Sequence, residues 1–306
     1  MRRAIVRIHR WVGIVLFAYV ALICLTGSAL VYRPELFRLF EPQPVEVPVG
    51  SARLDDKQIL AAAASVFPRE EPTAVWPARE PHHAVEVELA RDGEIRGYLF
   101  DPYTGEPLGH AIPWDYWAVS RLLELHTELL GGDSGRLVNG MLGLGLVFMA
   151  LSGVLVWKPR KRKASSASTG RPPGNLRRLH MTVGIWAALF AFMWGLTGAN
   201  LVYPDVLMAV VDYFEPFDET NPVERVGDKV SYWFAYMHFG RFGGYIPGCE
   251  RGMACDQALK AMWALIALAP AFLAGSGFVL WLRGRRARAR VRRSAVPEPV
   301  AGPPIG

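Results

Sequence analysis

Residues 7–32 read RIHRWVGIVLFAYVALICLTGSALVY, and residues 178–203 read RLHMTVGIWAALFAFMWGLTGANLVY. At an offset of 171 residues the two stretches are identical at 11 of 26 positions without a gap. Apolar composition alone produces chance matches of Leu and Val, but it does not place Arg, His, Thr and Tyr in register. The shared pattern therefore predicts an internal duplication, in which His9 corresponds to His180.

Four apolar runs in the chain are long enough to cross a membrane as helices. A hydrocarbon core of about 30 Å needs about 20 residues at a rise of about 1.5 Å each. Hydrophobic residues make up 51% of the chain, and the four runs are 11–32, 137–157, 181–203 and 258–282. The first run follows a basic start, as in a signal peptide, but it is too long and no convincing cleavage site follows it. The sequence therefore predicts an all-α integral membrane protein with four transmembrane helices in two duplicated pairs.

Charge is distributed unevenly between the segments that flank these runs. Segments 1–10, 158–178 and 283–306 hold 19 of the 34 Lys and Arg but only one of the 28 Asp and Glu. The positive-inside rule places these segments, and both termini, on the cytoplasmic side of a bacterial inner membrane. For the arginine-rich tail we expect contact with membrane lipid and no nucleic acid, because the tail directly follows a spanning helix.

These assignments divide the chain into eight segments. Residues 1–33 form the cytoplasmic N-terminus and the first transmembrane helix, and residues 34–136 form a periplasmic domain followed by a helix that precedes the second span. The rest are the second span (137–157), a cytoplasmic loop (158–178), the third span (179–203), a periplasmic loop (204–257), the fourth span (258–282) and a basic cytoplasmic tail (283–306).

The segment 34–136 contains the signals of a small α+β domain, inserted between the first two transmembrane helices. DDKQILAAAASVF (55–67) predicts a helix, because aspartates stand at its start and apolar residues recur at helical spacing. AVEVELARDGEIRGYLF (84–100) predicts two strands around a turn at Asp92-Gly93. The alternating positions expected to face a core are Val85, Val87 and Leu89.

The second and fourth runs correspond more weakly than the first and third. His126 precedes a Gly-Gly pair, and His238 precedes another at identical spacing. Ser-Gly pairs at 152–153 and 276–277 also match, with 12 additional residues between these landmarks in the second half. The longer segment includes Cys249 and Cys255, which an oxidising periplasm would allow to pair. Because pairing depends on geometry, the sequence leaves it open.

Four of the seven histidines lie beside the spans, one for each span. A single histidine there is explained by the headgroup layer, but the duplication pairs these four and sorts them by membrane side. Two imidazoles that face each other across a helix bundle fill both axial positions of a haem iron, whereas zinc more often recruits Cys or carboxylate ligands. We therefore predict two b-type haems, with iron bound by His9 and His180 on the cytoplasmic side and by His126 and His238 on the periplasmic side.

Residues around the histidines suit a flat cofactor with carboxylate groups. Gly13 and Gly184 lie one helical turn after the two cytoplasmic histidines, where a missing side chain leaves room for a ring. Arg7 and Arg178 precede the same histidines by two residues and are predicted to bind haem propionates. The arginines are the weaker signal, because arginines at helix ends also set topology.

Several of these motifs resemble those of one family. HRWVG (9–13), H-x4-GG before the second span, LH-x2-VG-x-W (179–186) and DPYTGEPLG (101–109) are similar to PepSY-associated transmembrane proteins of bacterial inner membranes, which include di-haem ferric-siderophore reductases. The resemblance extends to about Arg286. It implies a PepSY-like fold for the outer domain, b-type haems in the bundle, electrons that enter from the cytoplasmic side, and reduction of a ferric chelate outside.

The sequence thus predicts a transmembrane haem protein that carries electrons from a cytoplasmic donor or a quinol to a periplasmic ferric siderophore or another ferric chelate. Reduction of Fe(III) to Fe(II) weakens its binding by hard oxygen donors and so releases the iron. Such a transfer needs no acid–base pair, and no catalytic residue is assigned. The alternative is a haem-free scaffold or regulator, in which the PepSY-like domain binds a periplasmic partner and the histidines are interfacial.

Overall fold

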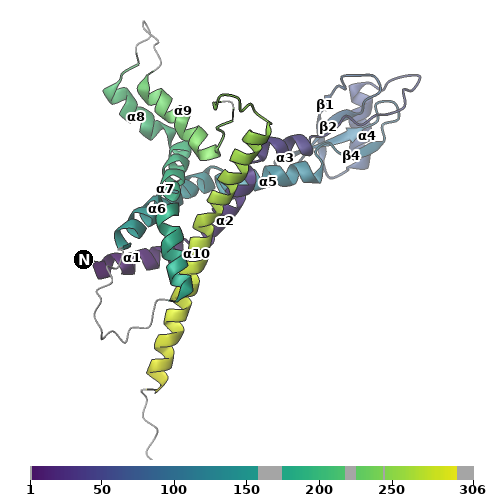
Figure 1. Cartoon of the computed structure of the whole chain (residues 1–306). Coiled ribbons are helices and arrows are strands. Elements are labelled where there is room, and N and C mark those ends of the chain that lie inside the picture. Colours follow the sequence, from purple (N-terminus) through teal and green to yellow (C-terminus); the bar gives the residue numbers. More distant parts are fainter. Residues whose placement is uncertain (1, 158–173, 218–224, 244, 295–306) are drawn as a thin grey trace, which may run out of the picture. The chain divides into compact units, whose positions relative to one another are not determined.

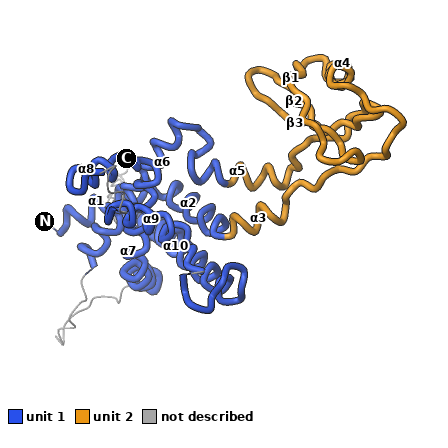
Figure 2. The backbone as a smooth tube through the Cα atoms, turned by 90° about the horizontal axis from the view of Figure 1, so that it is seen from above, with its two compact units in different colours: residues 1–31, 123–306 blue, residues 32–122 orange. Residues whose placement is uncertain are grey.

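The computed structural model describes residues 2–157, 174–217, 225–243 and 245–294, and it divides into two compact units (Figure 2). The larger unit contains residues 1–31 and 123–306, and the smaller contains residues 32–122. Most of the predicted cytoplasmic loop and the end of the predicted basic tail lie outside the described residues. Each unit is described by itself below.

The smaller unit is built around a four-stranded antiparallel sheet. Its strands follow chain order: β1 (Glu71–Trp76), β2 (Val85–Arg91), β3 (Glu94–Phe100) and β4 (Pro107–His110). Its helices are α3 (Arg33–Leu39), α4 (Asp56–Val66) and the first part of α5 (Trp114–Glu128). The predicted helix and hairpin are confirmed as α4, β2 and β3. The sequence does not predict β1 or β4, because neither shows the alternation of apolar and polar residues that identifies a strand.

Side chains from α4, β2 and β3 form the core of this unit. Val85, Val87 and Leu89 are at most 1% exposed and pack with Ile59 and Phe100. The prediction that these alternating β2 positions face a core is confirmed. Burial of one face of the strand fixes its register, since a slip by one residue would turn this face outward.

Two local signals fix the ends of these elements. Asp92 and Gly93 have positive φ values of 52° and 83°, as a two-residue type I′ hairpin turn requires. At the start of α4 the Asp55 carboxylate accepts a hydrogen bond from the Gln58 N–H, and the Gln58 side chain accepts one from the Asp55 N–H. This capping box satisfies two N–H groups that the helix leaves free.

Among the described residues of the larger unit, three helices are long and apolar enough to cross a membrane: α6 (Gly132–Val156), α7 (Asn175–Val202) and α10 (Ala254–Ser294). They contain the second, third and fourth predicted runs. Large apolar side chains such as Leu189 and Leu265 are exposed on them, which suits contact with lipid. The prediction of a mostly helical membrane protein is confirmed.

The first predicted run, 11–32, is not one straight helix. It is divided between α1 (Arg2–Val15) and α2 (Phe17–Leu30), which meet at Leu16 with a bend of 61°. α1 carries four arginines and is amphipathic, whereas α2 carries no charged residue. A helix with four arginines suits hydrocarbon less than an uncharged one, and the bend coincides with this change in polarity. Counted as one bent span, the pair brings the candidate membrane spans to four.

Glycines allow a close approach of α6 and α7, which pack side by side (Figure 1). A Cβ atom on Gly195 of α7 would lie 2.7 Å from the carbonyl oxygen of Gly143 on α6. Small residues at such a crossing are typical of helix packing in membranes, where close contact replaces the hydrophobic effect. Since α10 packs against both α2 and α7, the spans form one bundle (Figure 1).

Between α7 and α10, the described part of the chain forms α8 (Pro204–Phe214) and α9 (Val226–Phe239). The sequence indicates a short segment around YWFAYMHF, which is confirmed as part of α9, but it does not predict α8. Proline opens α8, and its fixed φ suits the first turn of a helix.

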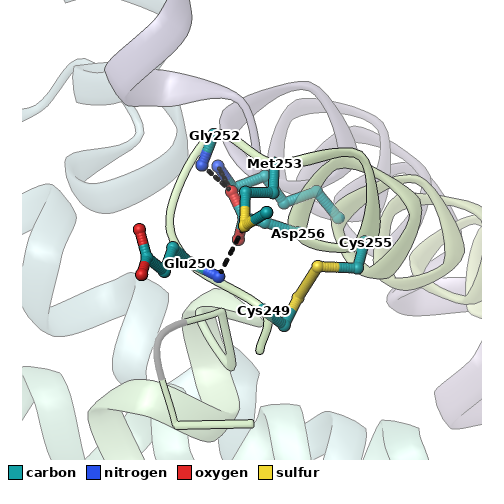
Figure 3. Close-up of a disulfide and its surroundings, with 7 residues drawn as sticks. Cys249, Glu250, Gly252, Met253, Cys255 and Asp256 are labelled. Atoms are coloured by element: carbon teal, nitrogen blue, oxygen red, sulfur yellow. Dashed lines mark hydrogen bonds and ion pairs between the residues drawn. A yellow bond between two sulfur atoms is a disulfide. The ribbon is translucent and has the colours of Figure 1, made fainter. Parts of the chain in front are cut away.

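Cys249 and Cys255, whose pairing the sequence leaves open, form a disulfide at the start of α10 (Figure 3). Their Cα atoms are 5.8 Å apart. Beside the bridge, the Asp256 carboxylate accepts hydrogen bonds from the Gly252 N–H and the Lys260 ammonium group. These contacts hold the cysteine loop against the first turns of α10.

Candidate functional site

The four duplicated histidines lie on four helices of the larger unit: His9 on α1, His126 on α5, His180 on α7 and His238 on α9. The ring nitrogen Nδ1 of each lies within hydrogen-bond distance of a buried hydroxyl group on a neighbouring helix. The distances are 2.7 Å for His9 and Ser152, 2.7 Å for His180 and Ser276, 2.9 Å for His126 and Thr26, and 3.0 Å for His238 and Thr197.

These hydroxyl groups determine which ring nitrogen carries the proton. Each hydroxyl donates its own hydrogen to a carbonyl about one turn earlier in its helix, as Thr26 does to Leu22 at 2.9 Å. With its only hydrogen in use, the oxygen can accept from the imidazole but not donate to it. When the hydroxyl hydrogen is used in this way, Nδ1 is the protonated nitrogen and Nε2 keeps its lone pair, as in a histidine that binds a metal through Nε2. The other three donors and their carbonyls are Ser152 with Met149, Thr197 with Met193, and Ser276 with Leu273.

A glycine directly follows each hydroxyl residue, and each histidine ring rests against that glycine. A Cβ atom on Gly27 would lie 2.8 Å from Cε1 of His126, closer than a side chain tolerates. The corresponding distances are 3.2 Å for Gly198 and His238, 3.5 Å for Gly153 and His9, and 3.3 Å for Gly277 and His180. The hydroxyl thus orients each ring, and the missing side chain gives it space.

The contacts repeat between the two halves of the chain. In the first half, the α1 histidine meets the Ser-Gly pair of α6, and the α5 histidine meets the Thr-Gly pair of α2. In the second half, the α7 histidine meets the Ser-Gly pair of α10, and the α9 histidine meets the Thr-Gly pair of α7. The duplication seen in the sequence is therefore also a duplication of histidine environments.

The structure brings His126 and His238 together. Their ring centroids are 6.4 Å apart, and the ring planes are inclined by 57°. Two imidazoles on opposite sides of one metal ion have centroids roughly 6 Å apart, because each bond is about 2 Å long and the ring centre lies about 1 Å further. The observed separation is that of a pair able to share one ion.

His9 and His180 lie at the other end of the bundle, called here the basic end because it carries the arginines of residues 2–10, 177–178 and 283–290. His180 is close enough to His9 to interact with it electrostatically. On α7, His180 and Thr197 are 17 residues apart, or about 25 Å along the helix. Two of the four histidines thus lie at each end of the bundle. Their role as iron ligands stays a prediction.

The four other residues that the sequence predicts to contact the cofactor have different surroundings. Gly13 lies against Met149, and Gly184 lies nearest to Leu273. The Arg7 and Arg178 side chains are exposed at the basic end. The glycines that do adjoin the rings follow the hydroxyl residues instead, and the predicted cofactor contacts of these four residues stay predictions.

A buried donor near the His126 and His238 pair has no hydrogen-bond partner among the described residues. It is Nε1 of Trp263, a side chain only 8% exposed. The Trp263 ring lies against Gly240, two residues after His238. An unpaired buried N–H costs about 1–3 kcal/mol, so this position favours a ligand that brings an acceptor such as a carboxylate.

The donor set differs from that of a zinc site. Within the described part of the chain, no group of three or more His, Cys, Asp and Glu side chains comes together. Structural zinc usually needs four such ligands and catalytic zinc three. Two histidines at each end of the bundle, a glycine beside each ring and an unpaired donor nearby fit haem, which needs two axial ligands from the protein.

A comparison with protein-family models matches residues 6–222 to the PepSY-associated TM region. The chain belongs to the PepSY-associated transmembrane family. The match includes His9, His126 and His180 but ends before His238, so it is shorter than the resemblance seen in the sequence, which extends to about Arg286. Among curated proteins, none matches the chain.

The four hydroxyl residues of this family member were not found by sequence reasoning. Their signal is nevertheless present, since Thr26 and Thr197 belong to the duplicated Leu-Thr-Gly block, and Ser152 and Ser276 belong to the matching Ser-Gly pairs. In each case the histidine ring lies against a glycine that directly follows a buried hydroxyl residue.

Replacing Thr197 by Val removes the acceptor for Nδ1 of His238 and keeps the side-chain volume. In protein purified without cofactor, we expect His238 to lose its preference for the Nδ1–H tautomer, as measured by nitrogen-15 chemical shifts of labelled histidine. Thr127→Val is the matched control, because the Thr127 hydroxyl donates to the Leu123 carbonyl. An unchanged His238 tautomer in Thr197→Val would show that the hydroxyl does not set it.

Proposed function

We propose that this membrane protein is a b-type haem electron-transfer protein that reduces a ferric siderophore, or another ferric chelate, in the bacterial periplasm. The observation that carries the proposal is the pair of His126 and His238, with ring centroids 6.4 Å apart and Nδ1 of each held by a threonine hydroxyl. The same construction at His9 and His180 gives a second site. Two sites at opposite ends of one bundle suit transfer across a membrane.

The residues of each pair would hold one haem b through their Nε2 atoms. Haem bound by two histidines supplies a one-electron couple and leaves no iron position open to oxygen. The hydroxyl groups keep Nδ1 protonated and so direct the lone pair of Nε2 into the site. Near the His126 and His238 pair, the Trp263 N–H is available to a propionate.

A cluster of aromatic side chains lies between the two ends of the bundle where the histidines are found. Phe190 and Trp194 lie on α7 between His180 and Thr197, and both rings contact Trp263 of α10 at centroid distances of 5.8 and 5.5 Å. Phe242 also contacts Trp263, at a centroid distance of 5.2 Å. Packing explains such a cluster by itself. The cluster includes two α7 rings located between His180 and Thr197, so it also offers π systems along a route between the pairs.

The orientation of the chain is part of the proposal. The basic end carries an excess of arginine, which favours the cytoplasmic side. The disulfide between Cys249 and Cys255 supports the same orientation, because disulfides persist in an oxidising periplasm and not in the cytoplasm. The pair of His126 and His238 then faces the periplasm, and both termini are cytoplasmic.

The overall reaction is a single-electron transfer. A cytoplasmic reductant or a quinol gives one electron at the basic end, and one ferric ion outside becomes ferrous. Ferrous iron is bound less tightly by hard oxygen ligands, so the chelate releases it. The side chains of the histidine pairs bind and orient, and none acts as an acid or a base.

The haem content of the purified protein tests the ligand assignment. We expect His238→Ala to lose about half of the haem, because one of two sites loses an axial ligand, and His180→Ala to lose the other half. His82→Ala, in the smaller unit, is the control and should keep both haems. A wild-type protein that is colourless after production with added haem would support the haem-free scaffold instead.

Vesicles test the direction of transfer and the acceptor. With the basic end inside, reduced protein should be oxidised within seconds by a membrane-impermeant ferric chelate added outside. In His126→Ala this oxidation should be at least tenfold slower, while the haem held by His9 and His180 is still reduced from within. Rapid oxidation of that haem from outside in the variant would remove the periplasmic pair from the electron path.

A further inference from the structure

A cleft of about 580 Å³ lies at the basic end between α1 and the last turns of α10. It is separate from the histidine pairs, since none of the four histidines lines it. Its lining consists of three arginines, two tryptophans and one isoleucine: Arg10, Trp11, Ile14, Trp281, Arg285 and Arg288. The helices contact each other directly, so both contribute to one cavity.

The charge of this cleft is uncompensated. The sequence has no Asp or Glu in residues 1–33 or 257–294, the two stretches that contribute its lining. Among the described residues, no acidic side chain pairs with Arg10, Arg285 or Arg288. Nε of Arg10 is buried, and no described residue accepts a hydrogen bond from it. Three like charges around one cavity, with a buried donor that lacks an acceptor, favour an anion bound among them.

The walls of the cleft are aromatic and apolar. The Arg285 guanidinium lies 5.5 Å from the ring centroid of Trp281, and Phe278 stacks on the same ring. Trp11 is half exposed on α1. Tryptophans with arginines beside them are typical of the level where a membrane changes from hydrocarbon to headgroups. A ligand that combines a negative charge with apolar groups matches both kinds of surface.

The position of the cleft along the helices points to the same ligand. α10 continues beyond the apolar run 258–282 into RGRRARAR, and the cleft lies where this change occurs. α1 is amphipathic and turns away from α2 by 61°, as a helix that lies in the headgroup layer does. The anions at this depth in a bilayer are phosphates, and the planar fork of arginine binds phosphate through two parallel hydrogen bonds.

We propose that this cleft binds a phosphate group, and that its source is an anionic phospholipid of the leaflet at the basic end. The phosphate accepts hydrogen bonds from Arg10 of α1 and from Arg285 and Arg288 of α10, and thereby ties the two helices together. Since α1 carries His9 and begins the bent span, the lipid also holds the α1–α2 bend. This site does not depend on the proposed electron transfer.

The test uses the full chain in neutral detergent, titrated with phosphatidylglycerol or phosphatidylcholine. Native mass spectrometry measures the bound fraction, and thermal unfolding measures stabilisation. We expect phosphatidylglycerol to bind and to raise Tm, and phosphatidylcholine to do so at least tenfold more weakly. Equal binding of the two lipids by the wild-type protein would overturn the proposal, and this comparison needs no variant.

Two triple variants distinguish lipid binding in the cleft from a general attraction between anionic lipid and basic helices. Changing Arg10, Arg285 and Arg288 to Gln should weaken phosphatidylglycerol binding about tenfold or more, since the phosphate loses its charged hydrogen-bond donors. The control changes Arg3, Arg283 and Arg286 to Gln, which removes the same charge from the same two helices outside the cleft. Equal losses in the two triple variants would show that the cleft is not a site.

Glycerol 3-phosphate distinguishes the two sources of phosphate. We expect it to compete only at millimolar concentration, because it lacks the acyl chains that the apolar wall contacts. If it bound as tightly as phosphatidylglycerol and required the same three arginines, the phosphate site would stand and the lipid assignment would be wrong.

Discussion

The site depends on one interaction, the hydrogen bond from histidine Nδ1 to a hydroxyl whose own hydrogen is already bound within its helix. When the hydroxyl donates to its own helix, its oxygen accepts from the imidazole, and the ring nitrogen that faces it carries the proton. The opposite nitrogen, Nε2, is then left with a lone pair at all four histidines. The shared contacts of these four imidazoles, in two groups of two, are the basis on which we propose metal binding.

Other features of the larger unit make these histidine–hydroxyl contacts possible. Glycines after the hydroxyl residues let the rings approach a neighbouring helix, and glycines between α6 and α7 bring the spans themselves close. The bend at Leu16 allows a basic helix to carry His9 against α6 while α2 remains apolar. The duplicated halves supply two copies of each contact, which places one histidine pair at each end of the bundle.

Sequence patterns predicted what local periodicity determines: the apolar runs, α4, and the hairpin of β2 and β3. They did not predict the bend at Leu16, because no proline or glycine stands there and the change of direction follows from the different surroundings of α1 and α2. They also missed the hydroxyl contacts, such as His9 with Ser152, since these join residues far apart in the chain. β4 is short and exposed on both faces, so its sequence carries no pattern to find.

The most direct test of the central claim is the electron paramagnetic resonance spectrum of the oxidised protein, purified after production with an ample haem supply. Two imidazoles bound to each ferric iron give a low-spin signal, so the account predicts low-spin haem at a ratio of two per chain. A high-spin ferric signal would show an iron with an open or weak axial position. That result, or a purified protein without haem, would contradict the assignment of the four histidines.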